Sequence, residues 1–327
     1  RLVVEKEEER EAFKSEEYWD FGVDVKDKNE NTLKAKLAQK DGKKYIPKEK
    51  DEVEGIEKLL GKSDYMVKDV VVKNIKKHPY PPFTTSTLQQ SANNVLGFSS
   101  KRTMAIAQIL YQAGYITYMR TDSFNLSSKA VDSIRDLINK KYGAEYLPEK
   151  PNYYKTRNKG AQEAHEAIRP TDFAVSKEQI EKQFGSAEAK LYDLIWRRAV
   201  SCQMSDKRAE VLTVSLVSND VKKPEYVFTL GGEMTLFDGF RKVLGSHKAV
   251  DDLQEVAKIE KGDVLKFVAF SKEQKFTQPP ARYTDASLVK KLEALEIGRP
   301  STYATIISTI EARGYVVKEN KALIPTD

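Results

Sequence analysis

The sequence predicts an α+β protein of several domains, in which a β-rich domain is interrupted by a helical insertion. In residues 18–75, and again after residue 206, apolar and polar residues alternate with the period of half-buried strands. Between these stretches, about 120 residues carry helical periodicity and helix-capping residues instead. We therefore expect the helical unit to be attached to the sheet by only two connections.

Local signals place the individual elements. A charged helical pattern covers residues 1–14, and Pro79, Pro81 and Pro82 end the first β-rich stretch. Ser86 and Gln89 form a capping-box pattern that is expected to open the first helix of the insertion. Strands are expected over residues 21–25, 33–37, 65–75, 211–217, 226–230 and 264–270, and further helices over residues 101–111, 127–141 and 301–313.

Part of the helical unit is repeated near the end of the chain. A shift of 200 residues, without gaps, aligns two stretches that both predict helix, tight turn, helix, Gly-Tyr and strand. This is the order of a helix-turn-helix module with a following strand, a unit that often places a helix end against nucleic acid. The identical residues are Thr84, Leu88, Ile106, Gly114 and Tyr115, which align with Thr284, Leu288, Ile306, Gly314 and Tyr315.

The charge distribution indicates a polyanionic partner. No Asp or Glu occurs from Val70 to Thr121, although 49 acids among 327 residues would give such a stretch about eight. A surface without acids suits a nucleic acid. The cations of the stretch are Lys73, Lys76, Lys77, Lys101, Arg102 and Arg120.

The β-prone stretch from Gly114 to Ser123 is the candidate catalytic segment. In a strand, Tyr118 and Arg120 would point to the same face. A phenol with a pKa of about 10 is a poor nucleophile unless the phenolate and the charge on the attacked group are stabilised. The guanidinium of Arg120 can hold two phosphate oxygens. Taken alone, the two residues would more often be a half-buried tyrosine and a solvated arginine on an edge strand.

Four blocks stand in order along nearly the whole chain: Pro82 to Gln90, Gly114 to Ser123, Gln162 to Pro170 and Ile297 to Ala304. Together they resemble the signature motifs of the bacterial type IA DNA topoisomerases. Met119, between Tyr118 and Arg120, is typical of topoisomerase I, whereas topoisomerase III usually has proline there.

The resemblance implies a domain organisation within a toroidal core. Residues 18–82 and 206–278 would form a β-rich hinge or arch domain, and residues 83–205 an inserted helical domain with the catalytic tyrosine. Residues 1–17 and 279–327 would be parts of a helical DNA-binding domain with the second helix-turn-helix repeat, a winged-helix-like unit. The insertion could move as a rigid body about its two connecting strands and so open a gate.

The resemblance also implies site residues. Tyr118 would be the nucleophile and Arg120 its electrostatic partner. His165, in a stretch expected to be helical, would approach a phosphate of the bound strand, with Glu166 holding its ring and Arg169 adding positive charge. The remaining DNA contacts would come from the helix N-terminus at Arg299, Ser301 and Thr302, where Ser301 or Thr302 can cap the helix and its free N–H groups favour an anion.

The implied reaction is transient cleavage of one DNA strand through a 5′-phosphotyrosine, strand passage and religation, which relaxes negative supercoils without ATP. The implied partner is single-stranded or negatively supercoiled DNA, which could stack on Phe98, Tyr111 and Tyr115. The family holds Mg²⁺ in an N-terminal acidic domain with an Asp-x-Asp-x-Glu cluster, and that motif does not occur here. Since the chain begins with Arg, we expect a core fragment that lacks this domain, carries no metal ligands, and binds DNA but cleaves it poorly.

Two other classes stay open. A non-catalytic helix-turn-helix DNA-binding protein would explain the charge and the repeat, whereas a tyrosine recombinase needs an Arg-His-x-x-Arg helix that the chain lacks. His78 and His247 match no motif and are expected to be structural. The single cysteine, Cys202, excludes a disulfide framework within the chain. The absence of a long apolar run or a signal peptide favours a cytoplasmic, nucleoid-associated protein with no membrane contact.

Overall fold

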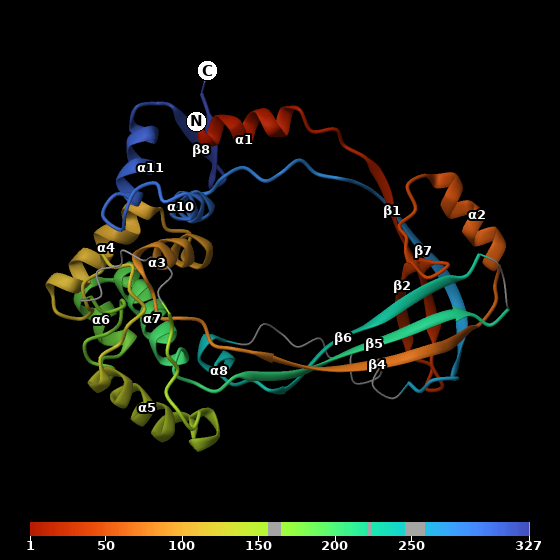
Figure 1. The fold of residues 1–327 in the computed structure, drawn as a ribbon, viewed down its shortest axis with the longest axis horizontal. Helices are drawn as coiled ribbons and strands as arrows, with labels where there is room; N and C mark the ends of the chain where they lie inside the picture. Colours follow the sequence, from red (N-terminus) through yellow and green to blue (C-terminus); the bar gives the residue numbers. More distant parts are fainter. Residues whose placement is uncertain (156–164, 221–223, 246–258, 327) are drawn as a thin grey trace.

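The computed structural model describes residues 1–155, 165–220, 224–245 and 259–326. The chain is a mixed α/β structure, with most helices gathered at one end and the strands of a large antiparallel sheet reaching the other (Figure 1). The ribbon has the shape of a ring in Figure 1, because separate segments join the helical end and the sheet end along two sides. No helix in the described part is long and apolar enough to cross a membrane.

Seven strands form the large sheet, and six of them close into a barrel. The sheet order is β1-β7-β4-β5-β6-β2-β3, and the additional pairing of β1 with β2 completes the circle. Inward residues such as Val23, Tyr65, Val214 and Phe228 fill the barrel. The strands are β1 (Glu17–Lys26), β2 (Thr32–Lys40), β3 (Lys43–Lys44), β4 (Tyr65–Lys77), β5 (Lys207–Ser218), β6 (Tyr226–Phe237) and β7 (Val264–Phe276).

A helix that the sequence analysis did not identify packs against the barrel. Helix α2 (Lys50–Leu60) places Val53, Ile56 and Leu60 in the barrel core, at the spacing of one helix face. Gly61, with φ of 60°, follows its last turn. The six strands expected in the β-rich stretches are confirmed as β1, β2, β4, β5, β6 and β7, and each extends beyond its predicted limits.

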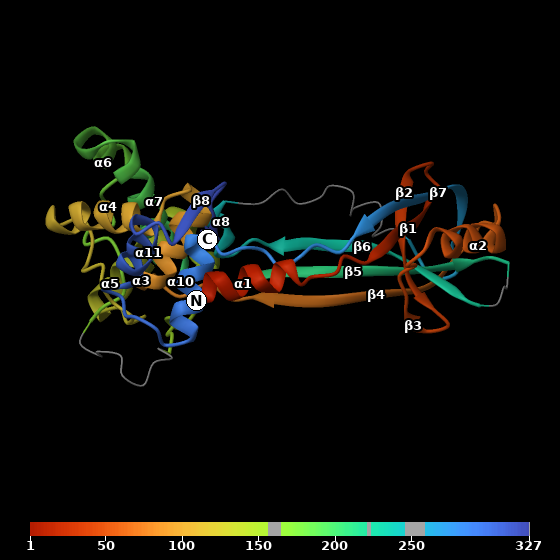
Figure 2. The ribbon, with the colours of Figure 1, turned by 90° about the horizontal axis from the view of Figure 1, so that it is seen from above.

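Strands β4 and β5 leave the barrel as a paired ribbon that reaches the helical end, and β6 stays paired with β5 along it as a third strand (Figure 2). Only Tyr65 and Val67 of β4 are buried, so the far part of β4 lies outside the barrel core. Its last pair is Lys77 with Lys207, and the predicted prolines follow directly. The helices between these two strands are α3 (Thr85–Ser91), the π-helix η1 (Ala92–Leu96), α4 (Ser100–Gln112), α5 (Ser128–Tyr142), the short 3₁₀ helix η2 (Ala144–Tyr146), α6 (Lys177–Phe184) and α7 (Ser186–Ser201).

The helical unit also packs against a segment that follows β6. Phe240 and Val243, the latter in helix α8 (Arg241–Leu244), are buried in one core cluster with Ile134 and Ile138 of α5. The chain therefore connects the helical unit to the sheet twice, as expected. The packing of the segment after β6 against α5 is a third contact between the helical unit and the rest of the chain. The division at residues 17, 82, 205 and 278 stays a prediction.

The C-terminal elements are α10 (Asp285–Ala294), α11 (Tyr303–Ala312) and the hairpin of β8 (Val316–Glu319) and β9 (Ala322–Pro325). Thr84 and Thr284, which differ by 200 positions, both cap a helix with a reciprocal capping box. The expected box at Ser86 and Gln89 is wrong, because both residues lie inside α3. Gly114 and Gly314 both adopt positive φ directly after a helix, where glycine is favoured.

The backbone hydrogen bonds extend this correspondence past the Gly-Tyr pair. Thr171 donates its N–H to the Tyr115 carbonyl at 3.0 Å, and Thr326 donates to the Tyr315 carbonyl at 3.1 Å. The hydroxyl of each threonine donates to the carbonyl of the glycine before that tyrosine. The sequence repeat is therefore also a repeat of hydrogen bonds, with Pro170-Thr171 in the place of Pro325-Thr326.

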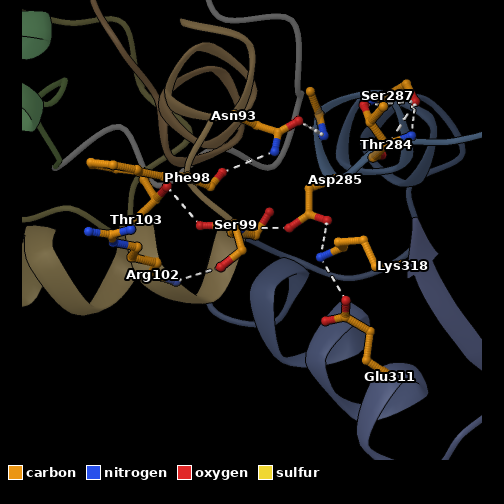
Figure 3. Close-up of polar contacts among 12 residues, drawn as sticks. Asn93, Phe98, Ser99, Arg102, Thr103, Thr284, Asp285, Ser287, Glu311 and Lys318 are labelled. Carbon is orange, nitrogen blue, oxygen red and sulfur yellow. Dashed lines mark hydrogen bonds and ion pairs between the residues drawn. The ribbon is translucent and has the colours of Figure 1, made fainter. Parts of the chain in front are cut away.

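The two repeats pack on each other through α3 and α10. Ser86 donates to Glu293 at 2.7 Å, and the Ala286 N–H donates to the Asn93 side chain at 3.3 Å. The shift of 200 relates Ser86 to Ala286 and Asn93 to Glu293, so each hydrogen bond joins the same two positions of the repeat, with the copies exchanged. The contact therefore has an approximate twofold axis. Figure 3 shows its buried polar part, in which Asp285 accepts the Ser100 N–H at 2.7 Å.

Candidate active site

The segment around Tyr118 is irregular, with bends at residues 117 and 119, and is not a strand. The structure gives it one isolated bridge, Ile116 with Pro170, so the expected strand is wrong. Ile116 and Met119 are nevertheless buried, and Tyr118 between them is 40% exposed. Tyr118 and Arg120 are both more exposed than Met119 and Thr121, so the expected alternation of burial holds over residues 118–121.

Hydrogen bonds fix the backbone on both sides of Tyr118. Thr85, at the start of α3, donates its hydroxyl to the Met119 carbonyl at 2.7 Å and accepts the Thr121 N–H at 2.8 Å. On the other side, Thr117 donates its N–H to the Arg169 carbonyl at 2.9 Å. Thr85 and Thr117 were not predicted as site residues, because a threonine in such a stretch carries no sequence signal of its partners.

The Tyr118 ring lies among other rings. Its centroid is 5.2 Å from that of Tyr111, in an edge-to-face arrangement, and 6.2 Å from that of His165. The structure thus brings together Tyr118 and His165, which are 47 positions apart in the sequence. It also adds Tyr111, from the last turn of α4, to the candidate site.

His165 does not lie in a helix. Residues 165–170 are extended, and Gln162 to Ala164 lie outside the described residues. The helical prediction fails because Ala167 and Ile168 are buried and their N–H groups donate to the carbonyls of Asn125 and Phe83. No hydrogen bond joins Glu166 to His165 among the described residues, so the expected support of the ring by Glu166 is wrong.

Glu166 instead joins two other groups. Its carboxylate accepts the Ser127 N–H at 2.5 Å and the Arg169 Nη2 at 2.6 Å. Burial would raise the pKa of the Glu166 carboxyl, but these hydrogen bonds outweigh burial and lower it. The Arg169 side chain is largely covered and also donates to the Pro170 carbonyl, so its guanidinium is held by Glu166 and the backbone and is not free in solvent.

Arg120 connects the two repeats. Its Nη1 donates to the Ser301 carbonyl at 2.8 Å, which brings the candidate segment to the start of α11. Of the two predicted capping residues, Ser301 and Thr302, the structure places Thr302 at the N-cap position of α11. Its hydroxyl accepts the Arg299 N–H, however, and makes no capping hydrogen bond to the helix. Arg299 donates its Nη1 to the Gly298 carbonyl at 2.8 Å and stays exposed.

The three aromatic residues proposed for base stacking have different environments. Phe98 is only 6% exposed and lies under the Arg102 guanidinium, at 4.4 Å, so it cannot stack on a base. Tyr115 is half-buried, contacts Phe184 and donates its hydroxyl to Gln183 at 2.5 Å. Only Tyr111 is exposed.

The described residues form no metal site. Across the described ranges, no group of three or more His, Cys, Asp or Glu side chains could hold a metal ion. The residues present there therefore do not fit a Mg²⁺ site. His78 forms a pair with Asp206 at 2.9 Å, between the ends of β4 and β5, and His247 lies outside the described residues.

Comparison with known proteins identifies the family. The profile of the DNA topoisomerase family matches residues 1–327, and the chain belongs to this family. The curated relatives are bacterial proteins named DNA topoisomerase 1. That of Haemophilus influenzae is 44% identical over 98% of this chain and 36% of its own length, and that of Vibrio cholerae is 46% identical over 97% and 35%. The resemblance inferred from the four sequence blocks is therefore confirmed.

A solved structure has the same fold. Full-length topoisomerase I from Thermotoga maritima superposes with a TM-score of 0.83 at 34% identity, covering 99% of this chain and 52% of its own. This chain thus spans about half of that structure and little more than a third of the two relatives named above.

Proposed function

We propose that the chain carries the nucleophile of a type IA DNA topoisomerase and part of the surface that binds the strand to be cut. The main support is Tyr118, whose exposed ring stands on a backbone fixed by Thr85 and by residues 167–169. A group that must attack from one position needs such a rigid support. Membership of the topoisomerase family agrees with this assignment.

The proposed reaction is transesterification at phosphorus. The phenol oxygen of Tyr118 loses its proton and attacks a DNA phosphate, so that an O–P bond forms and the bond from phosphorus to the 3′ oxygen breaks. The 3′ oxygen takes up a proton, and the 5′ end stays joined to the tyrosine. Attack by the 3′ hydroxyl later reverses the step. Because one phosphodiester replaces another, no ATP is needed.

The neighbouring residues would bind and orient the strand. Arg120 uses Nη1 on the Ser301 carbonyl, which leaves the rest of its guanidinium for phosphate oxygens. His165 lies beside the Tyr118 ring and would contact a phosphate next to the scissile one. Arg169 would contribute positive charge from its covered position beside Glu166. Arg299 with Ser301 and Thr302 would hold the strand at the start of α11.

We further propose that this chain works with a metal held elsewhere. The described residues offer no Mg²⁺ site, so we expect acidic groups from another part of the polypeptide to bind the ion. The toroidal arrangement in Figure 1 is consistent with a gate that admits a second strand, and relaxation of negative supercoils would follow.

The decisive experiment is an adduct assay. The chain, joined in one polypeptide to the acidic domain expected to precede it, is incubated with Mg²⁺ and 3′-labelled single-stranded DNA and resolved on a denaturing gel. We expect a covalent adduct that disappears in Tyr118→Phe. DNA binding without an adduct in either protein would instead favour a non-catalytic helix-turn-helix module.

A further inference from the structure

The last turn of α4 presents a second tyrosine to the candidate nucleophile. The Tyr111 and Tyr118 rings meet edge to face at 5.2 Å, with an interplanar angle of 63°. Tyr111 is 39% exposed, so its ring is not part of the core. Neither hydroxyl has a hydrogen-bond partner within the described ranges. Ring contact is therefore the interaction that joins the two side chains.

We propose that Tyr111 is a positioning residue that orients the Tyr118 ring for attack; this inference rests on the proposed function of Tyr118. The backbone at Tyr118 is already fixed through Met119 and Thr117. The remaining freedom is rotation of the side chain, which is exposed on one side. A ring in the last turn of a helix is a rigid neighbour, and edge-to-face pairs favour one mutual orientation.

The second repeat supports this assignment independently. Positions 111 and 118 correspond to Glu311 and Lys318, which form an ion pair at 2.6 Å. The same two positions of the repeat therefore touch in both copies, with different chemistry. Their proximity is a property of the repeated backbone and does not depend on one side-chain rotamer. In the first copy, this contact is between an exposed ring and the candidate nucleophile.

The proposal distinguishes the ring of Tyr111 from its hydroxyl. Tyr111→Phe keeps the ring and should form the adduct at the wild-type rate. Tyr111→Leu removes the aromatic contact and should slow single-turnover adduct formation about twofold to tenfold, the range expected for loss of one aromatic pair. The dissociation constant for single-stranded DNA should not change. Tyr153→Leu, at a tyrosine that is 82% exposed, is the matched control and should have no effect.

A second measurement is independent of activity. With 3-fluorotyrosine at position 118, the ¹⁹F resonance should carry the ring-current shift of Tyr111, keep it in Tyr111→Phe and lose it in Tyr111→Leu. Positioning is refuted if Tyr111→Leu cleaves as fast as wild type, or if its whole defect is weaker binding, which would make Tyr111 a base-stacking residue. The proposed function itself fails if wild type forms no adduct or if Tyr118→Phe still forms one.

Discussion

Lys318 neutralises a buried carboxylate at the contact between the two repeats, and its removal should destabilise the protein. Asp285 is 2% exposed in its side chain, and its carboxylate contacts Lys318 Nζ at 2.8 Å and the Ser100 N–H at 2.7 Å (Figure 3). Burial would lower the pKa of Lys318, but its hydrogen bonds to Asp285 and Glu311 outweigh burial and raise it. Lys318 is therefore protonated at neutral pH.

The magnitude follows from the exposure of the two partners. Removing one partner of a fully buried ion pair costs about 3–5 kcal/mol, because the other charge is left unpaired. Lys318 is 28% exposed, so water can partly replace it, and Asp285 keeps the Ser100 N–H. We therefore expect Lys318→Met to lower the free energy of unfolding by about 1–3 kcal/mol.

A double mutant tests the cause. Asp285→Asn removes the buried charge but can still accept the Ser100 N–H, so it should restore stability when added to Lys318→Met. Urea unfolding of the four proteins gives the coupling free energy. Glu5→Gln, at the solvent-exposed pair with Arg1, is the control and should be without measurable effect. The reasoning is refuted if Lys318→Met is as stable as wild type, or if Asp285→Asn destabilises it further.

Three further predictions concern the interior and the gate. Gln89 is fully buried, and neither of its amide atoms has a hydrogen-bond partner in the part of the chain that the structure describes, so Gln89→Met should raise the free energy of unfolding by about 1–3 kcal/mol, measured in urea; a decrease would show that the amide is paired. Folding lowers the pKa of the Glu166 carboxyl. Its contribution to stability is therefore complete above the unfolded-state pKa of about 4.3 and is lost as the pH falls through the folded-state pKa. The stability difference between wild type and Glu166→Gln should thus be constant from about pH 7 to 5 and shrink below about pH 4, and an unchanged difference at low pH would contradict this. In the polypeptide joined to the acidic domain, a disulfide between Ser86→Cys and Glu293→Cys, whose side chains hydrogen-bond in the structure, should block relaxation of supercoiled DNA but not adduct formation, and reductant should reverse the block. Relaxation that persists in the oxidised protein would exclude opening at this contact.

Local signals predicted several helices and their ends, whereas long-range pairing decided what the sequence could not show. Helix α5 begins after Ser127 and ends before Gly143, as predicted, because capping depends only on neighbouring residues. The closure of the barrel depends on β1 meeting β7 and on β2 meeting β6, and no local pattern specifies these two pairings. Phe98 and His165 were misjudged for the same reason. Phe98 is covered through tertiary packing, and the backbone beside His165 bonds to Phe83 and Asn125, which lie far away in the sequence.

The repeat itself explains why only one copy presents the proposed nucleophile. In the second copy, the hairpin is continuous: Val317 pairs with Ile324, Lys318 pairs with Leu323, and residues 320–321 form the turn. In the first copy, Thr117 bonds to Arg169 in the same way, but residues 118–168 stand between them. The insertion carries α5 and brings His165 back to Tyr118. Where the hairpin continues, position 318 is a lysine that faces Asp285 and Glu311. Where it is interrupted, the same position of the repeat carries an exposed tyrosine on a fixed backbone, and this is the geometry that a protein nucleophile requires.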